Sequence, residues 1–213
     1  NHEVCGVNRI SFGMQDLDPN VQRRVNRMQP AKLFEDILTE KVRKVYQEIA
    51  FDLLIGQPGQ TVSSMEKTCD GVIKLKPTLV QLSLMAYKPW VSKYQIRMVE
   101  EGPLPDFFER KELMEVIHKK LKSAGYIRTG FECYSLPDSP MTKAYKTGEA
   151  HYGASGHQPG GRVNFIAVGS SSMSNLGNDY YVQNFYDIKS YKKALDKGLL
   201  PAFRGLKLSD DDK

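Results

Sequence analysis

Apolar and polar residues alternate near the start of the chain in a way that is typical of a β-strand. In residues 9–15 the even positions are Ile, Phe and Met, and the odd positions are small or polar. Residues 49–56 are almost continuously apolar, which favours a strand buried on both faces of a parallel sheet. A third strand is predicted within TLVQLSLMAYKPW, residues 78–90.

Helical patterns separate these strands. DLDPNVQRRVNRM (residues 16–28) reads as a short helix with Asp18 as N-cap and Pro19 in the first turn. Helical stripes also run through residues 30–48, 61–77 and 106–126, and Gly125 ends the last one. The alternation of strand and helix predicts an α/β fold, with right-handed β-α units around a parallel sheet.

The pattern changes after Gly125, and the sequence predicts two parts, 1–125 and 126–213. In the second part, residues 139–149 suggest a short helix, and HYGASGHQPGGR (151–162) suggests a glycine-rich loop without regular structure. VNFIAVGSSSMSNLG (163–177) suggests an apolar strand that runs into a Ser/Gly loop. A further strand and an amphipathic helix are expected in residues 179–198.

Composition narrows the class of protein. The chain has 213 residues, 40% of them hydrophobic, which suits a globular domain with its own core. No segment approaches the length of a membrane-spanning helix, and the first residues do not resemble a signal peptide. The chain begins without Met and enters a strand pattern at once, so we interpret it as a fragment.

Charge and cysteine usage suggest an anionic partner and a reducing compartment. The net charge of +5 favours anionic ligands, but acidic residues lie among the basic ones, as on a solvated surface, and nucleic-acid binding is not expected. Cys5, Cys69 and Cys133 are widely separated and form no metal-binding pair. Three isolated thiols are consistent with the cytoplasm.

Candidate ligand-binding residues follow the predicted strands, because ligands bind beyond the carboxyl ends of parallel strands. A glutamine amide such as that of Gln15 can donate and accept, and Arg27 or Arg23 could hold a carboxylate. A capping glutamine and surface arginines would give the same pattern, so both interpretations stay open. Asp52 interrupts an apolar strand, and a buried carboxylate needs a ligand or a hydrogen-bonding neighbour.

Several motifs argue against other kinds of site. GQPGQT lacks the Lys-Ser/Thr ending of a nucleotide-binding P-loop, so we interpret it as a tight turn capped by Thr61. His151 and His157 have no acidic or thiol neighbour at ligand spacing, so no metal site is expected.

Longer motifs resemble a known family. GVNRISFGMQDLDPNVQRRVNRMQ, FDLLIGQPGQT and KPTLVQLSLMAYKPW are similar to the oxygen-independent coproporphyrinogen III oxidases, which are radical S-adenosylmethionine enzymes. LKSAGYIRTGFECYSLPDSPMTKA, IAVGSSSMSNLGNDYYVQN and FRGLKLSDDD continue the resemblance. It implies the C-terminal half of a partial (β/α) barrel in residues 1–125, and a small α+β accessory segment that packs on the barrel in residues 126–213.

The resemblance also implies a cofactor site. Gln15 and Arg27 match residues that hold S-adenosylmethionine, with Arg27 on the methionine carboxylate, and Asp52 matches a polar contact. Ala86 matches a position that lines the cofactor pocket, and Met173 matches an apolar position near a second cofactor molecule. The cysteine loop that holds the family's [4Fe–4S] cluster is absent from this chain and would precede residue 1.

The implied reaction is the oxidative decarboxylation of coproporphyrinogen III to protoporphyrinogen IX in haem biosynthesis. A 5′-deoxyadenosyl radical abstracts hydrogen from a propionate side chain, and loss of CO2 and an electron leaves a vinyl group. Where the family usually has Asp-His-Phe-Ala, this chain has Glu132-Cys133-Tyr134-Ser135, which leaves the exact tetrapyrrole open. A haem chaperone and a haem-degrading methyltransferase of the same superfamily are the alternatives.

An open half-barrel would leave its first strand unpaired at the edge of the sheet. We therefore predict that the chain either self-associates through this strand or covers the edge with its terminal segment. Without the cluster ligands, the 213 residues alone are expected to be inactive.

Overall fold

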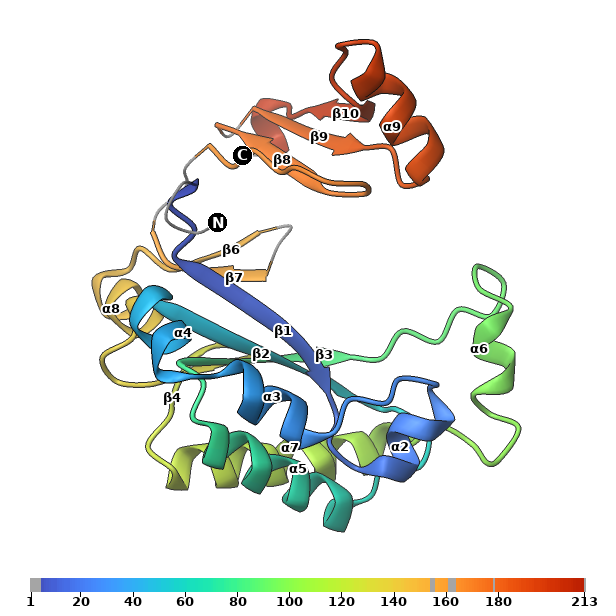
Figure 1. Ribbon diagram of the computed structural model, residues 1–213, viewed down its shortest axis with the longest axis vertical. Helices are drawn as coiled ribbons and strands as arrows, with labels where there is room; N and C mark the ends of the chain where they lie inside the picture. Colours follow the sequence, from blue (N-terminus) through green and yellow to red (C-terminus); the bar gives the residue numbers. More distant parts are fainter. Residues whose placement is uncertain (1–4, 154–155, 161–163, 178, 213) are drawn as a thin grey trace. The chain divides into compact units, whose positions relative to one another are not determined.

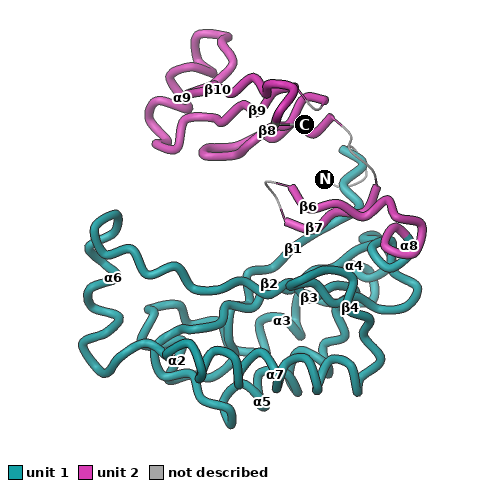
Figure 2. Tube along the Cα trace, turned by 180° about the vertical axis from the view of Figure 1, so that it is seen from behind, with its two compact units in different colours: residues 1–143 teal, residues 144–213 magenta. Residues whose placement is uncertain are grey.

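The computed structural model describes residues 5–153, 156–160, 164–177 and 179–212. The chain divides into two compact units, residues 1–143 and 144–213, which Figure 2 shows in teal and magenta. The boundary falls within α8 (Pro140–Thr147), later than the predicted boundary at residue 125. We describe each unit by itself.

Unit 1 contains a five-stranded sheet in the order β1-β2-β3-β5-β4. Strands β1, β2 and β3 are parallel, as predicted, and β5 and β4 continue the sheet in antiparallel orientation. The elements of unit 1 before α8 are β1 (Arg9–Gln15), α2 (Pro19–Arg24), α3 (Ala31–Ile37), α4 (Glu40–Val45), β2 (Glu48–Ile55), α5 (Val62–Leu75), β3 (Leu79–Leu84), α6 (Tyr94–Arg97), α7 (Phe107–Ser123), β4 (Ile127–Gly130) and β5 (Cys133–Ser135).

The hairpin of β4 and β5 explains why the predicted boundary was too early. Cys133 and Tyr134 pair with β3, and both are buried, so this segment completes the first sheet and is not accessory to it. A second difference lies in residues 30–48, which form the two helices α3 and α4. Thr39 separates them, because its side chain accepts a hydrogen bond from the backbone N–H of Val42 and so starts a new helix.

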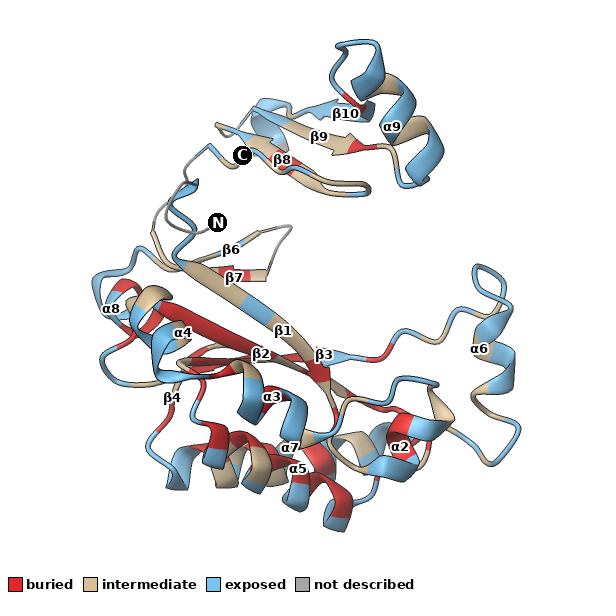
Figure 3. Ribbon diagram, in the orientation of Figure 1, coloured by how far each residue is buried: buried red, intermediate tan, exposed pale blue. Residues whose placement is uncertain are grey.

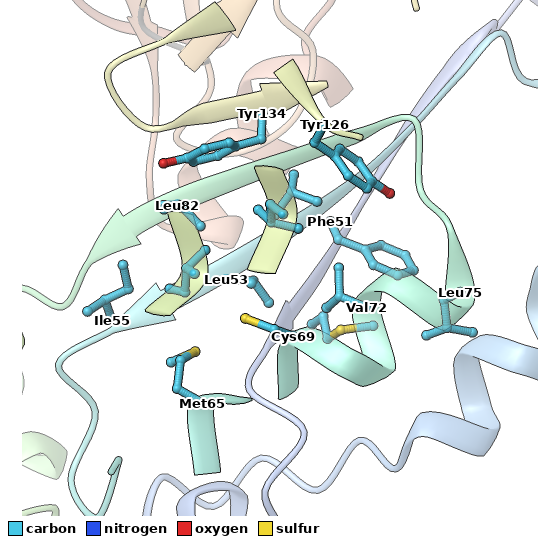
Figure 4. Packing of buried hydrophobic residues seen from close by; sticks show 14 of the residues in the cluster. Phe51, Leu53, Ile55, Met65, Cys69, Val72, Leu75, Leu82, Tyr126 and Tyr134 are labelled. Atoms are coloured by element: carbon cyan, nitrogen blue, oxygen red, sulfur yellow. The ribbon is translucent and has the colours of Figure 1, made fainter. Parts of the chain in front are cut away.

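Helices α3, α5 and α7 cover one face of the sheet, as Figure 1 shows. The hydrophobic core lies between them and the alternate residues of the strands (Figures 3 and 4). The predicted caps Asp18 and Thr61 accept backbone hydrogen bonds at the starts of α2 and α5. These two helices follow the carboxyl ends of β1 and β2, so their first turns lie beside the strand ends where the site was predicted.

Unit 2 contains smaller sheets of antiparallel strands. After α8 its elements are β6 (His151–Gly153), β7 (Gly156–Gln158), β8 (Met173–Leu176), β9 (Tyr180–Asn184), α9 (Ile188–Asp196), β10 (Ala202–Lys207) and a 3₁₀ turn (Asp210–Asp212). The order β10-β9-β8 gives a three-stranded sheet, and β6 pairs with β7. The predicted strand before a helix in residues 179–198 corresponds to β9 and α9.

Two predictions for unit 2 were wrong. The glycine-rich segment forms the hairpin β6–β7, in which Gly156 adopts a left-handed φ of 85° and the rings of Tyr152 and His157 lie 4.9 Å apart. In residues 164–177 the strand is β8, within the segment expected to be a loop. The apolar residues before it form only an isolated bridge, between Phe165 and Asn175. A prediction based on hydrophobic residues alone therefore placed the strand too early in the sequence.

Candidate functional site

The site begins with a strained turn at the end of β1. Gln15 has a φ of 64°, and the N–H of Asp16 donates to the carbonyl of Met14 over 2.8 Å, which closes a γ-turn. A residue other than glycine in this conformation costs on the order of 1–3 kcal/mol. At this turn the pairing of β1 with β2 shifts in register, so the half-buried Gln15 side chain does not continue the alternation of side chains along the strand.

Arg27 lies beside the same turn, in the segment that follows α2. Its Nη2 donates to the carbonyl oxygen of Gly13 over 2.7 Å, and its Nε donates to Oε1 of Gln29 over 2.6 Å. A Cβ atom at position 13 would lie 2.8 Å from Arg27 Nη2 and 3.0 Å from Gln15 Nε2. Glycine is therefore required at position 13 for the guanidinium and the amide to approach the strand together.

Gln15 and Arg27 line one pocket of about 200 Å³. The other lining residues come from the end of β2 and from the segments that follow α2, β2, β3 and α6, and are Val25, Leu54, Gln57, Met85 and Met98. The pocket thus combines a guanidinium and two amides with aliphatic and thioether side chains. The structure brings the two predicted residues together, as the sequence argument required.

A buried hydrogen-bond network holds the turns beside the pocket in place. Asp16 is only 1% exposed, and its carboxylate accepts from the Asp18 N–H, the Thr68 hydroxyl and Nε2 of Gln60 over 2.7–2.8 Å. Oε1 of Gln60 accepts in turn from the N–H groups of Gly56 and Gln57. The network therefore joins the turn after β1 to the turn after β2. Burial raises the pKa of Asp16, and these hydrogen bonds partly offset that effect.

A second buried amide holds Arg27 in place through Gln29. Nε2 of Gln22 donates to the carbonyl oxygens of Asp16 and Gln29 over 2.8 and 2.7 Å, and its Oε1 accepts from the N–H of Gln29. Since the Gln29 side chain accepts from Arg27, the position of the guanidinium depends on the buried Gln22. These contacts give Gln22, Arg27 and Gln29 a structural role in the segment that follows the first strand.

Sequence reasoning missed the supporting residues. Gln22 and Gln60 were not singled out, because a buried amide in a short helix or turn has the same local pattern as a surface one. Met85 and Met98 were missed as well, although Met85 directly precedes the predicted Ala86. The motif GQPGQT, which we interpreted only as a tight turn, supplies both Gln57 and Gln60.

The other predicted residues lie elsewhere. Asp52 is half-buried on β2 and accepts a 2.6 Å hydrogen bond from the hydroxyl of Ser11; burial raises the pKa of its carboxyl. Ala86 is exposed beyond β3, where its carbonyl accepts from Gln95. Neither belongs to the residues that line the pocket of Gln15 and Arg27. Met173 belongs to β8 in unit 2.

The alternative arginine, Arg23, is already engaged. Its Nη1 and Nη2 donate to the two carboxylate oxygens of Glu101 over 2.9 and 3.0 Å. This leaves Arg27 as the cation that faces the pocket. Within the described part of the chain, no three His, Cys, Asp or Glu side chains gather as a metal site would require.

The chemistry of the pocket fits part of the predicted cofactor. Guanidinium and amide groups suit a carboxylate and an amino group, and the thioether and aliphatic walls suit a methionine side chain. A [4Fe–4S] cluster needs cysteine thiolates. Cys69 and Cys133 are buried, and burial raises their pKa values to about 12 and about 11, so neither thiol is suited to hold a cluster. Cys5 is exposed, but a single thiol does not make up the set of ligands that a cluster needs. The described residues therefore fit the amino-acid portion of S-adenosylmethionine and do not fit the cluster.

Comparisons with known proteins point in the same direction. The chain is 34% identical over 209 residues to the oxygen-independent coproporphyrinogen III oxidase of Helicobacter pylori, a match that covers 97% of this chain and 45% of that protein. It is 34% identical over 208 residues to the enzyme of Pseudomonas aeruginosa, covering 98% and 45% respectively. The chain thus spans about half the length of the curated relatives that it matches. No family model matches the chain.

A solved structure agrees with the sequence matches. The chain superposes on coproporphyrinogen III oxidase from Escherichia coli, described as a radical SAM enzyme, with a TM-score of 0.86 and 27% identity over 99% of this chain and 48% of that one. These comparisons confirm the resemblance found in the sequence and the α/β fold with parallel strands.

Proposed function

We propose that this chain supplies the S-adenosylmethionine-binding half of an enzyme that oxidises coproporphyrinogen III to protoporphyrinogen IX without oxygen. The observation that carries the proposal is the shared pocket of Gln15 and Arg27, in a chain that matches such oxidases over 97% of its length. In this function Arg27 binds the methionine carboxylate, Gln15 orients the amino-acid portion, and Met85 and Met98 surround the methylene chain that leads to its sulfonium.

We further propose where the remaining parts of the cofactor site lie. The sheet of unit 1 would form half of a partial barrel, and the ligands of the [4Fe–4S] cluster would come from residues outside this chain. Asp52 and Ala86 would contact S-adenosylmethionine. The resemblance assigns Met173 to a second cofactor molecule, and this assignment competes with the tetrapyrrole site argued below for the pocket that Met173 lines. The enzyme would work in the cytoplasm, which its three isolated cysteines favour. Among the described residues, no helix has the length and apolar character to cross a membrane.

We also propose that the exposed edge of the sheet in unit 1 is covered. Strand β1 is an edge strand in the described sheet, so the predicted self-association through it, or its cover by the terminal segment, stays a prediction.

Binding of S-adenosylmethionine to the chain tests the role of the pocket. We expect calorimetric titration to detect binding, and Arg27→Gln to weaken it at least tenfold, or about 1.4 kcal/mol. Arg23→Gln is the matched control, since it removes the same charge from a nearby arginine that Glu101 already engages. The control is expected to bind within a factor of two of the native chain. Equal affinity of both variants, or no binding by the native chain, would contradict the assignment.

The tetrapyrrole is tested separately. Coproporphyrin III carries the same four propionates as the proposed substrate and is fluorescent and stable in air, so it serves as the probe. We expect the chain to bind coproporphyrin III more tightly than haem in parallel titrations. A clear preference for haem would favour the haem chaperone or the methyltransferase instead.

A further inference from the structure

We propose that the sheet of unit 2 carries a second site, at which Arg204 binds a carboxylate on an apolar ring, specifically a propionate of the tetrapyrrole. The inference rests on the proposed function and goes beyond it, because it assigns a substrate-binding role to residues outside the pocket of Gln15 and Arg27. The site is a pocket of about 430 Å³ on the three-stranded sheet. Its lining residues are Met173, Tyr181, Gln183, Arg204, Gly205 and Leu206.

The register of the sheet explains how these side chains meet. Gln183 of β9 is paired with Met173 of β8 on one side and with Arg204 of β10 on the other. Tyr181 is paired with Leu206 two residues further along. Because side chains two residues apart lie on the same face of a strand, these two rows form a continuous surface. The pocket is thus built on one face of regular structure.

Arg204 is held in a defined orientation. Its Nε donates to Oε1 of Gln183 over 2.8 Å, and Nε2 of Gln183 donates to the carbonyl oxygen of Ser171 over 3.3 Å. Within the described part of the chain, no partner is recorded for the two Nη groups of Arg204. A guanidinium fixed through Nε in this way presents its Nη groups to a carboxylate or another planar anion.

The walls of the pocket are mostly apolar apart from Arg204 and the amide of Gln183. Met173 and Leu206 are aliphatic, and Tyr181 adds an aromatic ring. Leu206 is 59% exposed on its strand. A volume of about 430 Å³ lies within the range of small-molecule sites, which combine mostly apolar walls with a few placed polar groups. Such a site discriminates in favour of a ligand with one carboxylate attached to an apolar body.

Charge and shape complementarity favour the tetrapyrrole as the occupant. Each pyrrole ring of coproporphyrinogen carries a propionate, so an apolar ring and a carboxylate lie a few bonds apart. In the pocket, likewise, Arg204 lies two residues from Leu206 on β10, and Leu206 is paired with Tyr181. The carboxylate of S-adenosylmethionine shares the anionic group, but it is attached to a polar ammonium-bearing carbon. Binding of the cofactor here is therefore the competing outcome of the test.

Fluorescence titration of the chain with coproporphyrin III tests the site. We expect Arg204→Gln to raise the dissociation constant at least tenfold and Arg204→Lys to restore part of the affinity. Gln183→Leu, which keeps the charge but removes the group that orients it, should raise the constant severalfold. Lys207→Gln is the matched control, because Lys207 carries a positive charge three residues further along the same strand and does not line the pocket. This variant should bind within a factor of two of the native chain.

The possible results separate this inference from the proposed function. If the native chain binds coproporphyrin III and Arg204→Gln binds equally well, the site is wrong and the function stands. If the native chain prefers haem, the function fails. Loss of S-adenosylmethionine binding in Arg204→Gln, with porphyrin binding unchanged, would assign the site to the cofactor and overturn our inference. Thermal unfolding of each variant checks folding; should Arg204→Gln fail to fold, Gln183→Leu and Arg204→Lys decide.

Discussion

The two units differ in what they bury. In unit 1, Phe51, Leu53 and Ile117 have no exposed surface, and the core extends over β1, β2, β3 and the helices that cover them. Beyond Ala144, the described buried residues include few large hydrophobic side chains, whereas Val168 and Leu200 are 85% and 88% exposed. Unit 1 therefore has its own source of stability, whereas unit 2, taken by itself, leaves much of its apolar surface exposed.

The same contrast holds for the two arginines to which we assign carboxylates. Two donors of Arg27 are engaged, and the acceptor Gln29 is itself held by the buried Gln22. Arg204 is held through a single hydrogen bond to Gln183 on a mostly exposed strand. The first guanidinium is thus preorganised by a core, and the second by one neighbour on a sheet. Preorganisation lowers the entropic cost of binding, so the first site should be the more selective.

The largest expected effect comes from separating the units. Residues 1–143 should unfold cooperatively in urea, because they retain the sheet and the helices that bury its core. Residues 144–213 alone should show neither a cooperative transition nor defined near-ultraviolet circular dichroism, since so little apolar surface is buried there. Coproporphyrin III added to residues 144–213 is the informative control, because a bound ligand stabilises the folded form. A cooperative transition in the ligand-free fragment would remove the contrast between the units.

A smaller but still large effect is expected from the network under the first pocket. Asp16→Ala would leave the Thr68 hydroxyl and the Gln60 amide without their buried acceptor, so we expect the free energy of unfolding to fall by roughly 3–5 kcal/mol. Urea denaturation measures the change. Asp16→Asn should cost less, because it retains an oxygen acceptor and removes a charge that burial disfavours.

Unit 2 supplies the comparison for that measurement. Gln183→Leu breaks the hydrogen bond to Arg204, but both groups lie near solvent, so the loss of stability should be about 1 kcal/mol or less. Equal losses for Asp16→Ala and Gln183→Leu would show that the Asp16 network does not stabilise unit 1 in the way described.

The strands of unit 1 could be predicted from the sequence better than those of unit 2. The parallel strands of unit 1 were predicted, because their apolar runs are long and their helices carry clear caps such as Asp18 and Thr61. Gln15 and Arg27 could be brought together because strand order determines where the carboxyl ends meet. In unit 2 the strands are three to six residues long, and exposed apolar residues such as Val168 mimic a strand that does not form.

What the sequence could not reveal was the partner of each polar side chain. Gln22 and Gln60 are buried amides whose acceptors lie 7 and 44 residues away in the chain. No local pattern encodes such a separation, because it depends on how the turns after β1 and β2 meet. Asp52 was predicted to need a ligand or a hydrogen-bonding neighbour, and for the same reason the sequence could not name Ser11 as the neighbour that it has.

The most local prediction concerns Gly13, where binding should change with little change in stability. A methyl group at this position would lie 2.8 Å from Nη2 of Arg27, so Gly13→Ala must displace the guanidinium from the strand. Arg27 is exposed and can move, so we expect unfolding stability to change by no more than about 1 kcal/mol. Affinity for S-adenosylmethionine should nevertheless fall about tenfold, because the cation loses its fixed position.

Gly205→Ala provides the counterpart in unit 2. A Cβ at position 205 would lie 3.3 Å from the backbone oxygen of Tyr181, on the sheet that carries Arg204. This change should leave S-adenosylmethionine binding intact while it disturbs the porphyrin site. If Gly13→Ala binds S-adenosylmethionine normally, the guanidinium need not lie against the strand in order to hold the carboxylate. Preorganisation by the buried network would then not distinguish the first site from the second, because a freely moving Arg27 would resemble Arg204.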